Sequence, residues 1–88
     1  MELKNTIDMM TSADYKERFK AEYYQTKERY EKLKAFNTKI AVAKMYNGKY
    51  IDMPKHDCPD ELLVDQENIM MRYLNILETR AMIEGIEL

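Results

Sequence analysis

Residues 12–46 read SADYKERFKAEYYQTKERYEKLKAFNTKIAVAKMY, and this stretch decides the fold. From Ala13 onward no proline or glycine occurs until Gly48. Large, mostly apolar side chains recur at alternating steps of four and three residues, which is the spacing of one helix face. They are Phe19, Tyr23, Thr26, Tyr30, Leu33, Asn37 and Ile40. The pattern predicts one long helix over 12–46, with Thr11 and Ser12 supplying its N-cap.

A second helix is predicted over residues 59–84. Pro59 fits its first position, and Asp60 and Glu61 place carboxylates at the positive end of the helix dipole. Gly85 ends the helix, because glycine readily takes the left-handed conformation of a C-cap.

Three shorter segments complete the chain, namely an arm or short helix at 1–11, a connection at 47–58 and a tail at 85–88. In the arm, Leu3, Ile7 and Met10 have the spacing of one helix side. At this length the chain supports one core. We therefore expect a single all-α domain over 1–88, in which two long helices form an antiparallel hairpin.

The second helix carries more apolar surface than one partner helix can cover. One stripe repeats every seven residues, joined by a tyrosine, as Leu62, Ile69, Ile76, Ile83 and Tyr73. A neighbouring stripe consists of Leu63, Met70, Leu74, Leu77 and Ala81. Together they exceed the ~100° of helix surface that one partner requires. Because exposed apolar surface of this width marks association surfaces, we expect a homo-oligomer.

Composition and charge argue against several classes of partner. No stretch approaches the ~18 apolar residues of a membrane span, and the first ten residues are too charged for a signal peptide. We therefore expect a cytoplasmic protein that does not bind membranes. The isoelectric point near 5.4 disfavours duplex DNA as a partner. Residues 13–45 carry a net charge of +4 and residues 59–88 a net charge of −5, which favours attraction between the two helices.

The sequence offers no catalytic residues, no metal ligands and no cofactor motif. His56, Asp57 and Cys58 form the one place where histidine and cysteine meet, and the chain has no second histidine or cysteine to complete a metal site. Adjacent residues rarely align as nucleophile and base. We interpret this segment as a polar loop, and we expect a protein that is not an enzyme.

A second stripe of the first helix combines aromatic, basic and amide or carboxylate side chains. Its members also alternate three and four apart, as Tyr15, Arg18, Glu22, Gln25, Arg29, Lys32 and Phe36. Tyrosine rings stack on bases, and arginine and lysine hold phosphates. This chemistry suits a pocket for a small anionic nucleotide between subunits. The alternative is a solvated charged flank, which is common on long helices.

The second helix has two cations, Arg72 and Arg80. Arg80 lies on the seven-residue stripe, where it either pairs with a carboxylate of the seam or meets an anionic ligand at an oligomer axis. The predicted ligand-binding residues are therefore Tyr15, Arg18, Glu22, Arg29, Lys32, Tyr73 and Arg80.

Several runs of the chain also carry a family resemblance. The first half contributes YKERF at 15–19 with Glu22, and RYEKLKAF at 29–36. The second half contributes CPDELL at 58–63, Gln66, Met70, Tyr73-Leu74, Leu77-Glu78, Arg80-Ala81 and IEGIEL at 83–88. With these residues the chain resembles small helical proteins of gut bacteriophages and prophages known as crAss-phage-related, a genomic rather than a biochemical description. It departs from them around 46–55, where its connection is longer.

The resemblance implies an accessory phage protein that acts against host defence in the host cell cytoplasm. At the level of architecture the chain is similar to phage sponge proteins, small helical oligomers that sequester cyclic nucleotide immune signals without cleaving them. The alternatives are a protein inhibitor of a host defence complex, like an anti-CRISPR, and a helical structural adaptor. For an inhibitor, the acidic second helix would mimic nucleic acid.

Overall fold

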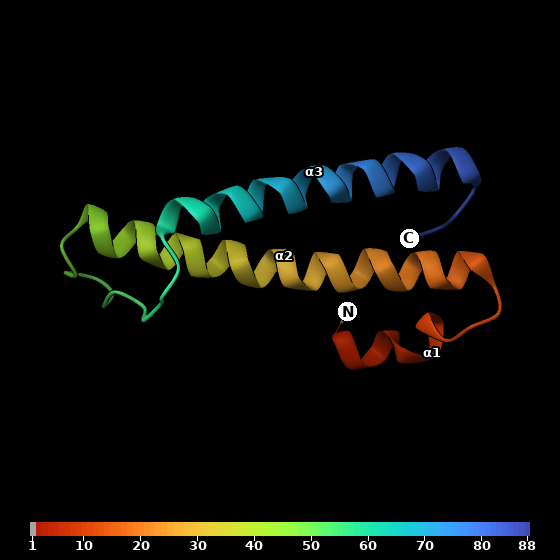
Figure 1. The fold of residues 1–88 in the computed structure, drawn as a ribbon, viewed down its shortest axis with the longest axis horizontal. Coiled ribbons are helices and arrows are strands. Elements are labelled where there is room, and N and C mark those ends of the chain that lie inside the picture. The colour runs from red at the N-terminus through yellow and green to blue at the C-terminus, as the bar shows by residue number, and fades with distance from the viewer. Residues whose placement is uncertain (1) are drawn as a thin grey trace.

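The computed structural model describes residues 2–88, and they form two long helices preceded by a short helical arm (Figure 1). In chain order the elements are the 3-10 helix η1 (Leu3–Thr6), α1 (Ile7–Met10), α2 (Tyr15–Met45) and α3 (Asp60–Glu84). α2 and α3 lie side by side and run in opposite directions (Figure 1). The molecule measures 50 × 25 × 20 Å. The expectation of an all-helical hairpin is confirmed for the described residues.

α2 begins at Tyr15 because Asp14 caps it, so the expected cap of Thr11 and Ser12 is wrong. The Asp14 carboxylate accepts the backbone N–H of Lys16 at 2.9 Å. The Ser12 hydroxyl instead accepts the backbone N–H of Asp14 at 3.1 Å, and the Thr11 hydroxyl donates back into α1. Asp14 directly precedes the helix, so its carboxylate can satisfy one of the first free N–H groups.

The core lies along the seam between α2 and α3. Its buried members are Phe19 and Tyr23 from α2, Leu74, Leu77 and Ala81 from α3, and Ile86 from the tail. The predicted seam of α2 is confirmed, since Asn37 and Ile40 are also buried and the other members are partly buried. On α3 the covered stripe contains Leu63 and Met70, which are partly buried, and the three core residues.

The tail closes one end of this core, which the sequence pattern did not anticipate. Gly85 ends α3 in the left-handed conformation at φ 70°, and the backbone N–H of Ile86 donates to the carbonyl of Ala81 at 2.8 Å. This geometry turns the chain back, and the Ile86 side chain is buried in the core with Phe19. A hydrophobic contact of this kind commonly accompanies a glycine C-cap.

The N-terminal arm packs on the side of α2 away from α3 (Figure 1). Thr6 is fully buried there, and its hydroxyl donates to the carbonyl of Leu3 at 2.6 Å. The side-chain amide of Gln25 donates to the Thr6 hydroxyl at 2.9 Å. Ala21 of α2 is also buried.

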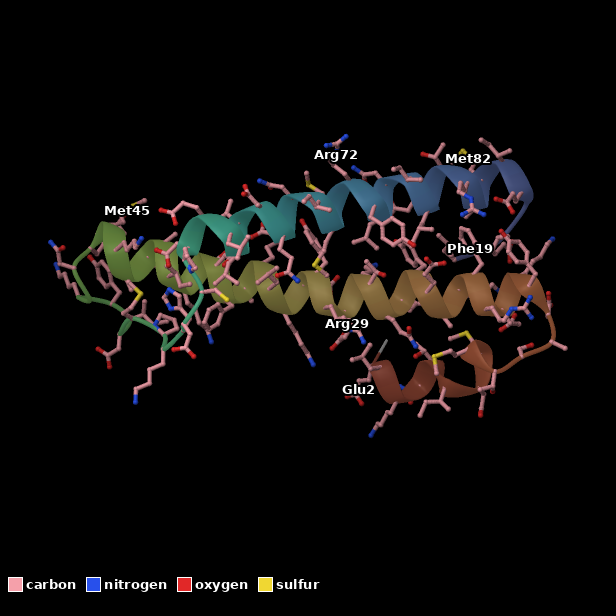
Figure 2. The ribbon with its side chains drawn as sticks, viewed as in Figure 1. Glu2, Phe19, Arg29, Met45, Arg72 and Met82 are labelled. Carbon is pink, nitrogen blue, oxygen red and sulfur yellow. The ribbon has the colours of Figure 1, made fainter. Side chains whose placement is uncertain are left out.

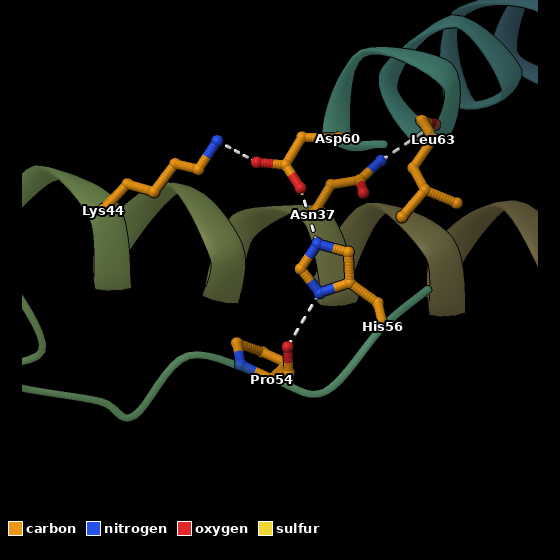
Figure 3. Close-up of polar contacts among 6 residues, drawn as sticks. All are labelled: Asn37, Lys44, Pro54, His56, Asp60 and Leu63. Carbon is orange, nitrogen blue, oxygen red and sulfur yellow. Dashed lines mark hydrogen bonds and ion pairs between the residues drawn. The ribbon is translucent and has the colours of Figure 1, made fainter. Parts of the chain in front are cut away.

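The connection folds back onto the other end of the hairpin. Asn47 and Gly48 both have positive φ, at 53° and 77°, which ends α2 as expected. The His56 ring then lies edge-on to Phe36, with centroids 5.9 Å apart. Its Nδ1 is 2.7 Å from the carbonyl oxygen of Pro54, and its Nε2 is 2.5 Å from Asp60 Oδ1 (Figure 3).

The two contacts of the His56 ring favour its imidazolium form. The Pro54 carbonyl and the Asp60 carboxylate both accept hydrogen bonds, so both ring nitrogens must donate. These two bonds, led by the one to Pro54, raise the pKa of His56. Lys44 pairs with the second oxygen of Asp60, and these contacts, led by Lys44, lower the pKa of that carboxyl (Figure 3). One charged cluster thus joins α2, the connection and the start of α3.

Asn37 provides a second polar contact between the helices. Its amide nitrogen donates to the Leu63 carbonyl at 3.1 Å (Figure 3). The same nitrogen donates to Glu67 Oε1 at 2.9 Å. Its own carbonyl oxygen is buried without a partner. Any slip of α3 along α2 would also leave the amide nitrogen unpaired, which costs free energy in a buried site. Asn37 therefore helps to fix the register of the hairpin.

Leu77 supplies the first test of the fold, because its side chain is only 1% exposed at the centre of the seam. Leu77→Ala should lower the free energy of unfolding by about 3 kcal/mol, through lost burial and an unfilled cavity. Met82, 86% exposed on the same helix, is the matched control. Met82→Ala should change the stability by less than about 0.5 kcal/mol in urea unfolding. Equal losses for the two variants would contradict the placement of the seam.

The His56 cluster predicts a pH-dependent contribution to stability. The pKa of His56 is raised in the folded chain, so its contribution is full below the unfolded value of about 6.5 and is lost as pH rises through the folded value. The Asp60 pKa is lowered, so this carboxylate stays ionised throughout that window. His56→Ala should therefore destabilise more at pH 5.5 than at pH 9 in urea unfolding. Lys55→Ala, in the same connection, serves as the control. An equal loss at both pH values would show that His56 is not held as an imidazolium.

Candidate functional site

The seven-residue stripe of α3 is left uncovered by the rest of the hairpin. Leu62, Ile69, Ile76 and Ile83 are 57%, 64%, 56% and 80% exposed. α2 covers the neighbouring stripe, while the arm and the connection pack on α2. The predicted surplus of apolar surface is therefore confirmed, and it lies on α3.

An open hollow interrupts this stripe at the middle of α3. It has a volume of about 230 Å³ and is lined by Ile69, Arg72, Tyr73 and Ile76. Arg72 points away from α2 (Figure 2). Two aliphatic side chains, a tyrosine ring and a guanidinium group thus border one concave surface. Such a mixture suits a ligand or partner with both apolar and anionic parts.

Tyr15, Arg80 and Glu84 form a hydrogen-bonded cluster between α2 and α3. Arg80 Nη2 donates to the Tyr15 hydroxyl oxygen at 2.6 Å, and Arg80 Nε donates to Glu84 Oε2 at 3.0 Å. The Tyr15 hydroxyl donates to Glu84 Oε1 at 3.0 Å. This last bond is the main reason that the pKa of Tyr15 is raised, and the carboxylate likewise raises the pKa of Arg80. The three side chains hold one another in fixed positions at the surface.

The guanidinium of Arg80 is also placed over an aromatic ring. Its Cζ lies 5.0 Å from the centroid of the Phe19 ring, within the range of a cation–π contact. Phe19 itself is buried and stacks edge-on with Tyr15 at 6.2 Å. The buried Phe19 ring therefore positions the Arg80 guanidinium, and the Arg80 side chain remains half-exposed to solvent.

Glu22 and Tyr73 connect this cluster to the hollow. The Tyr73 hydroxyl donates to Glu22 Oε1 across the two helices, and the Tyr73 ring lines the hollow. Four of the seven predicted site residues thus share one side of the hairpin, namely Tyr15, Glu22, Tyr73 and Arg80. We call this group, together with Glu84, the Tyr15–Arg80 face.

The other three predicted residues lie elsewhere. Arg18 donates to the backbone carbonyl of Ser12 at 2.8 Å, so it holds the turn before α2. Lys32 pairs with Glu28 at 3.4 Å, one turn earlier in its own helix. Arg29 lies on the side of α2 away from α3 (Figure 2). The aromatic–basic stripe is therefore divided between the face, the arm and solvent.

Sequence reasoning missed Glu84 and placed Arg72 outside the site. Glu84 stands four residues after Arg80, and this spacing is the signal that could have identified the pair. Arg72 stands four residues before Ile76 and three after Ile69, which places it beside the apolar stripe. Arg72 lines the hollow, and Glu84 lies beside Arg80.

A second hollow of about 220 Å³ lies on the opposite edge of the seam. Its lining includes Tyr23, Tyr30, Lys27, Asn75 and Glu78. The Tyr23 hydroxyl donates to Glu78 Oε2 at 2.6 Å, and burial is the main reason that its pKa is strongly raised. The Lys27 ammonium lies 5.9 Å from the centroid of the Tyr23 ring. This hollow offers a lysine but no arginine fork to a ligand.

The histidine and the cysteine of the connection have separate surroundings. His56 binds Pro54 and Asp60, and Cys58 is exposed. Within residues 2–88, no three side chains of the metal-binding types gather at one point. Nor does any helix of residues 2–88 combine the length and the apolar composition needed to cross a bilayer.

Comparison with known proteins gives one match to a family. The model of the family described as Sequestin matches residues 13–83. This range contains all of α2 and all but the last residue of α3, so both helices of the seam and most of the Tyr15–Arg80 face fall inside it. No curated protein and no solved structure matches the chain.

Glu84→Gln tests the geometry of the cluster without any ligand. The glutamine keeps the shape of the side chain and removes the carboxylate, whose hydrogen bond is the main cause of the raised pKa of Tyr15, while Arg80 remains. The pKa of Tyr15 should therefore fall. The measurement is tyrosinate absorbance near 295 nm, with Tyr15 identified as the difference from the Glu84→Gln/Tyr15→Phe double variant. A Tyr15 titration that Glu84→Gln leaves unchanged would contradict the contact.

Proposed function

The chain belongs to the Sequestin family, and we propose that it works by binding and sequestering a ligand rather than by catalysis. The name of the family describes this mode of action. The structure supplies a surface suited to it, since an open hollow adjoins a preorganised cluster of tyrosine and arginine side chains.

We propose that the ligand is a small anionic nucleotide, of which a cyclic nucleotide is the leading example. The observation that carries this proposal is the position of Arg80, held over Phe19 and between Tyr15 and Glu84 with its outer face half-exposed. A guanidinium fork binds phosphate oxygens through two parallel hydrogen bonds. The rings of Tyr15 and Tyr73, both partly exposed, are available to stack on a base.

Glu84 has a defined part in this scheme. In the free protein it neutralises Arg80 and fixes its orientation through a bond of 3.0 Å. An incoming phosphate would compete with this carboxylate for the same guanidinium. Because the pair is exposed at the surface, its net contribution is small and displacement costs little. Glu84 thus keeps the site ordered while it is empty.

Among the cations predicted to hold phosphates, Arg80 is the one that we propose as the main phosphate ligand. Arg18 and Lys32 already have partners away from the Tyr15–Arg80 face, and Arg29 lies on another side of α2. Arg72 borders the hollow and supplies a second guanidinium close to Tyr73. We propose that a second copy of the chain completes the site, because the apolar surface beside it is uncovered.

The biological setting follows from the resemblance to phage proteins. We propose that the protein is phage-encoded and acts in the cytoplasm of the infected cell, where it lowers the free concentration of a nucleotide immune signal. The alternatives are a protein inhibitor of a host defence complex and a helical adaptor. Both predict that no small nucleotide binds.

A thermal-shift panel of cyclic di- and trinucleotides and ADP-ribose derivatives tests the proposal. A ligand at a hundred times its dissociation constant adds about 2.7 kcal/mol of stability, which gives a clear upward shift in Tm. A flat panel at millimolar ligand would refute the nucleotide proposal and favour the protein inhibitor or the adaptor.

If a nucleotide of the panel binds, variants of the two residues of the Arg80–Glu84 ion pair test whether it binds at this pair. Arg80→Ala should weaken binding about tenfold or more, because charge-assisted bonds to phosphate are lost. Glu84→Gln should tighten binding up to about fivefold, because a competing anion is removed. Lys39→Ala, an exposed cation of α2 outside the face, is the control and should bind as the unaltered chain does. If Arg80→Ala and Glu84→Gln both bind the nucleotide as the unaltered chain does, the ligand does not bind at this ion pair.

A further inference from the structure

We propose that a second copy of this chain packs antiparallel along the uncovered stripe of α3, with a two-fold axis through the hollow between Arg72 and Tyr73. The inference rests on that part of the proposed function in which a second copy completes the site. It adds the orientation and register of the two copies.

The uncovered stripe has the symmetry that a two-fold interface requires. Leu62, Ile69, Ile76 and Ile83 recur every seven residues, so their midpoint falls between positions 72 and 73. The hollow is lined by Ile69, Arg72, Tyr73 and Ile76, and it has the same midpoint. In an isologous dimer one patch must be complementary to itself about a single axis. The stripe and the hollow define the same axis.

Antiparallel packing about this axis brings like shapes together. Ile69 faces the second copy's Ile76, and Leu62 faces the second copy's Ile83. The seven-residue repeat keeps the stripe in line over the ~31 Å from Leu62 to Ile83, because two helices that share such a repeat coil gently around each other. All four side chains are more than half exposed in the single copy.

The charges beside the stripe select the antiparallel orientation. Asp65 and Arg80 lie equally far from the midpoint, so each meets its opposite in the second copy, while Arg72 meets the second copy's Tyr73. Attraction between opposite charges and between a guanidinium and a ring favours this pairing. Parallel packing would place Asp65 on Asp65, Arg72 on Arg72 and Arg80 on Arg80. In each of these three pairs, two like charges would then repel each other.

The same packing brings functional groups of two copies together. Tyr73 of each copy, which is tied to Glu22 and lines the hollow, meets the Arg72 guanidinium of the other. Arg80, which belongs to the Tyr15–Arg80 face, lies beside the second copy's Asp65. The interface therefore adds a cation from one copy to the tyrosine of the other, and the completed site contains residues of both.

Disulfide trapping tests the register directly. In a Cys58→Ser background, Ile69→Cys and Ile76→Cys chains are prepared separately and then mixed under conditions that allow copies to exchange. Mild oxidation should link the mixture into a dimer. Each variant alone should stay unlinked, since equivalent positions are then ~10 Å apart along the axis, beyond the ~7 Å that a disulfide can span between Cα atoms.

Met82→Cys provides the matched control. Met82 is the most exposed large apolar residue of α3, at 86%, and it lies roughly 130° round the helix from the stripe. A mixture of Met82→Cys and Ile76→Cys should therefore not form the linked dimer. Efficient linking of Ile69→Cys alone would show a parallel dimer, and no linking in any mixture would refute the interface.

A charge exchange tests the pairing by a second route. Asp65→Arg and Arg80→Asp should each shift the mass measured by light scattering toward that of a single copy. The double variant should restore the mass of the dimer, because the two charges are exchanged. If the unaltered chain, the two single variants and the double variant all have the same mass, the pairing of Asp65 with Arg80 is wrong.

The tests of the interface and the test of nucleotide binding can give different results. Specific linking together with a flat ligand panel would keep the interface and refute nucleotide sequestration. A positive panel without specific linking would keep sequestration and refute the interface.

Discussion

The packing of α3 against one side of α2 is the contact on which the rest of the structure depends. Phe19 and Tyr23 meet Leu74 and Leu77 along a seam that uses one of the two apolar stripes of α3. The arm and the connection cover further sides of α2. Within residues 2–88 the arm does not contact α3, and the connection meets the start of α3 through His56 and Asp60. The geometry of a helix pair therefore leaves the stripe from Leu62 to Ile83 in contact with solvent.

The Tyr15–Arg80 face forms at the edge of this seam for the same reason. Phe19 is buried, so the Arg80 guanidinium above it rests on a fixed aromatic surface. Tyr15 and Glu84, one near the start of α2 and one at the end of α3, meet because the helices are antiparallel. In the proposed site these contacts would hold charges and rings in place, which would lower the entropy lost when a ligand binds.

The sequence was sufficient to predict the two helices and the surplus stripe, because both follow from periodicity within one element. Contacts between different elements were harder to predict from the sequence. Arg18 was expected to hold a phosphate, but the turn before α2 brings the Ser12 carbonyl to it. Ile86 belonged to a predicted tail, yet the left-handed Gly85 directs it into the core. Such outcomes depend on how the chain turns, which spacing along one helix does not encode.

The proposed function is sequestration of a nucleotide without chemical change. The most direct test measures a cyclic dinucleotide in the filtrate after incubation with excess protein, before and after heat denaturation of the protein. If the protein sequesters the nucleotide, the nucleotide should disappear from the filtrate and return with its mass and amount unchanged once the protein unfolds. A nucleotide that stays in the filtrate, or returns cleaved, would contradict sequestration.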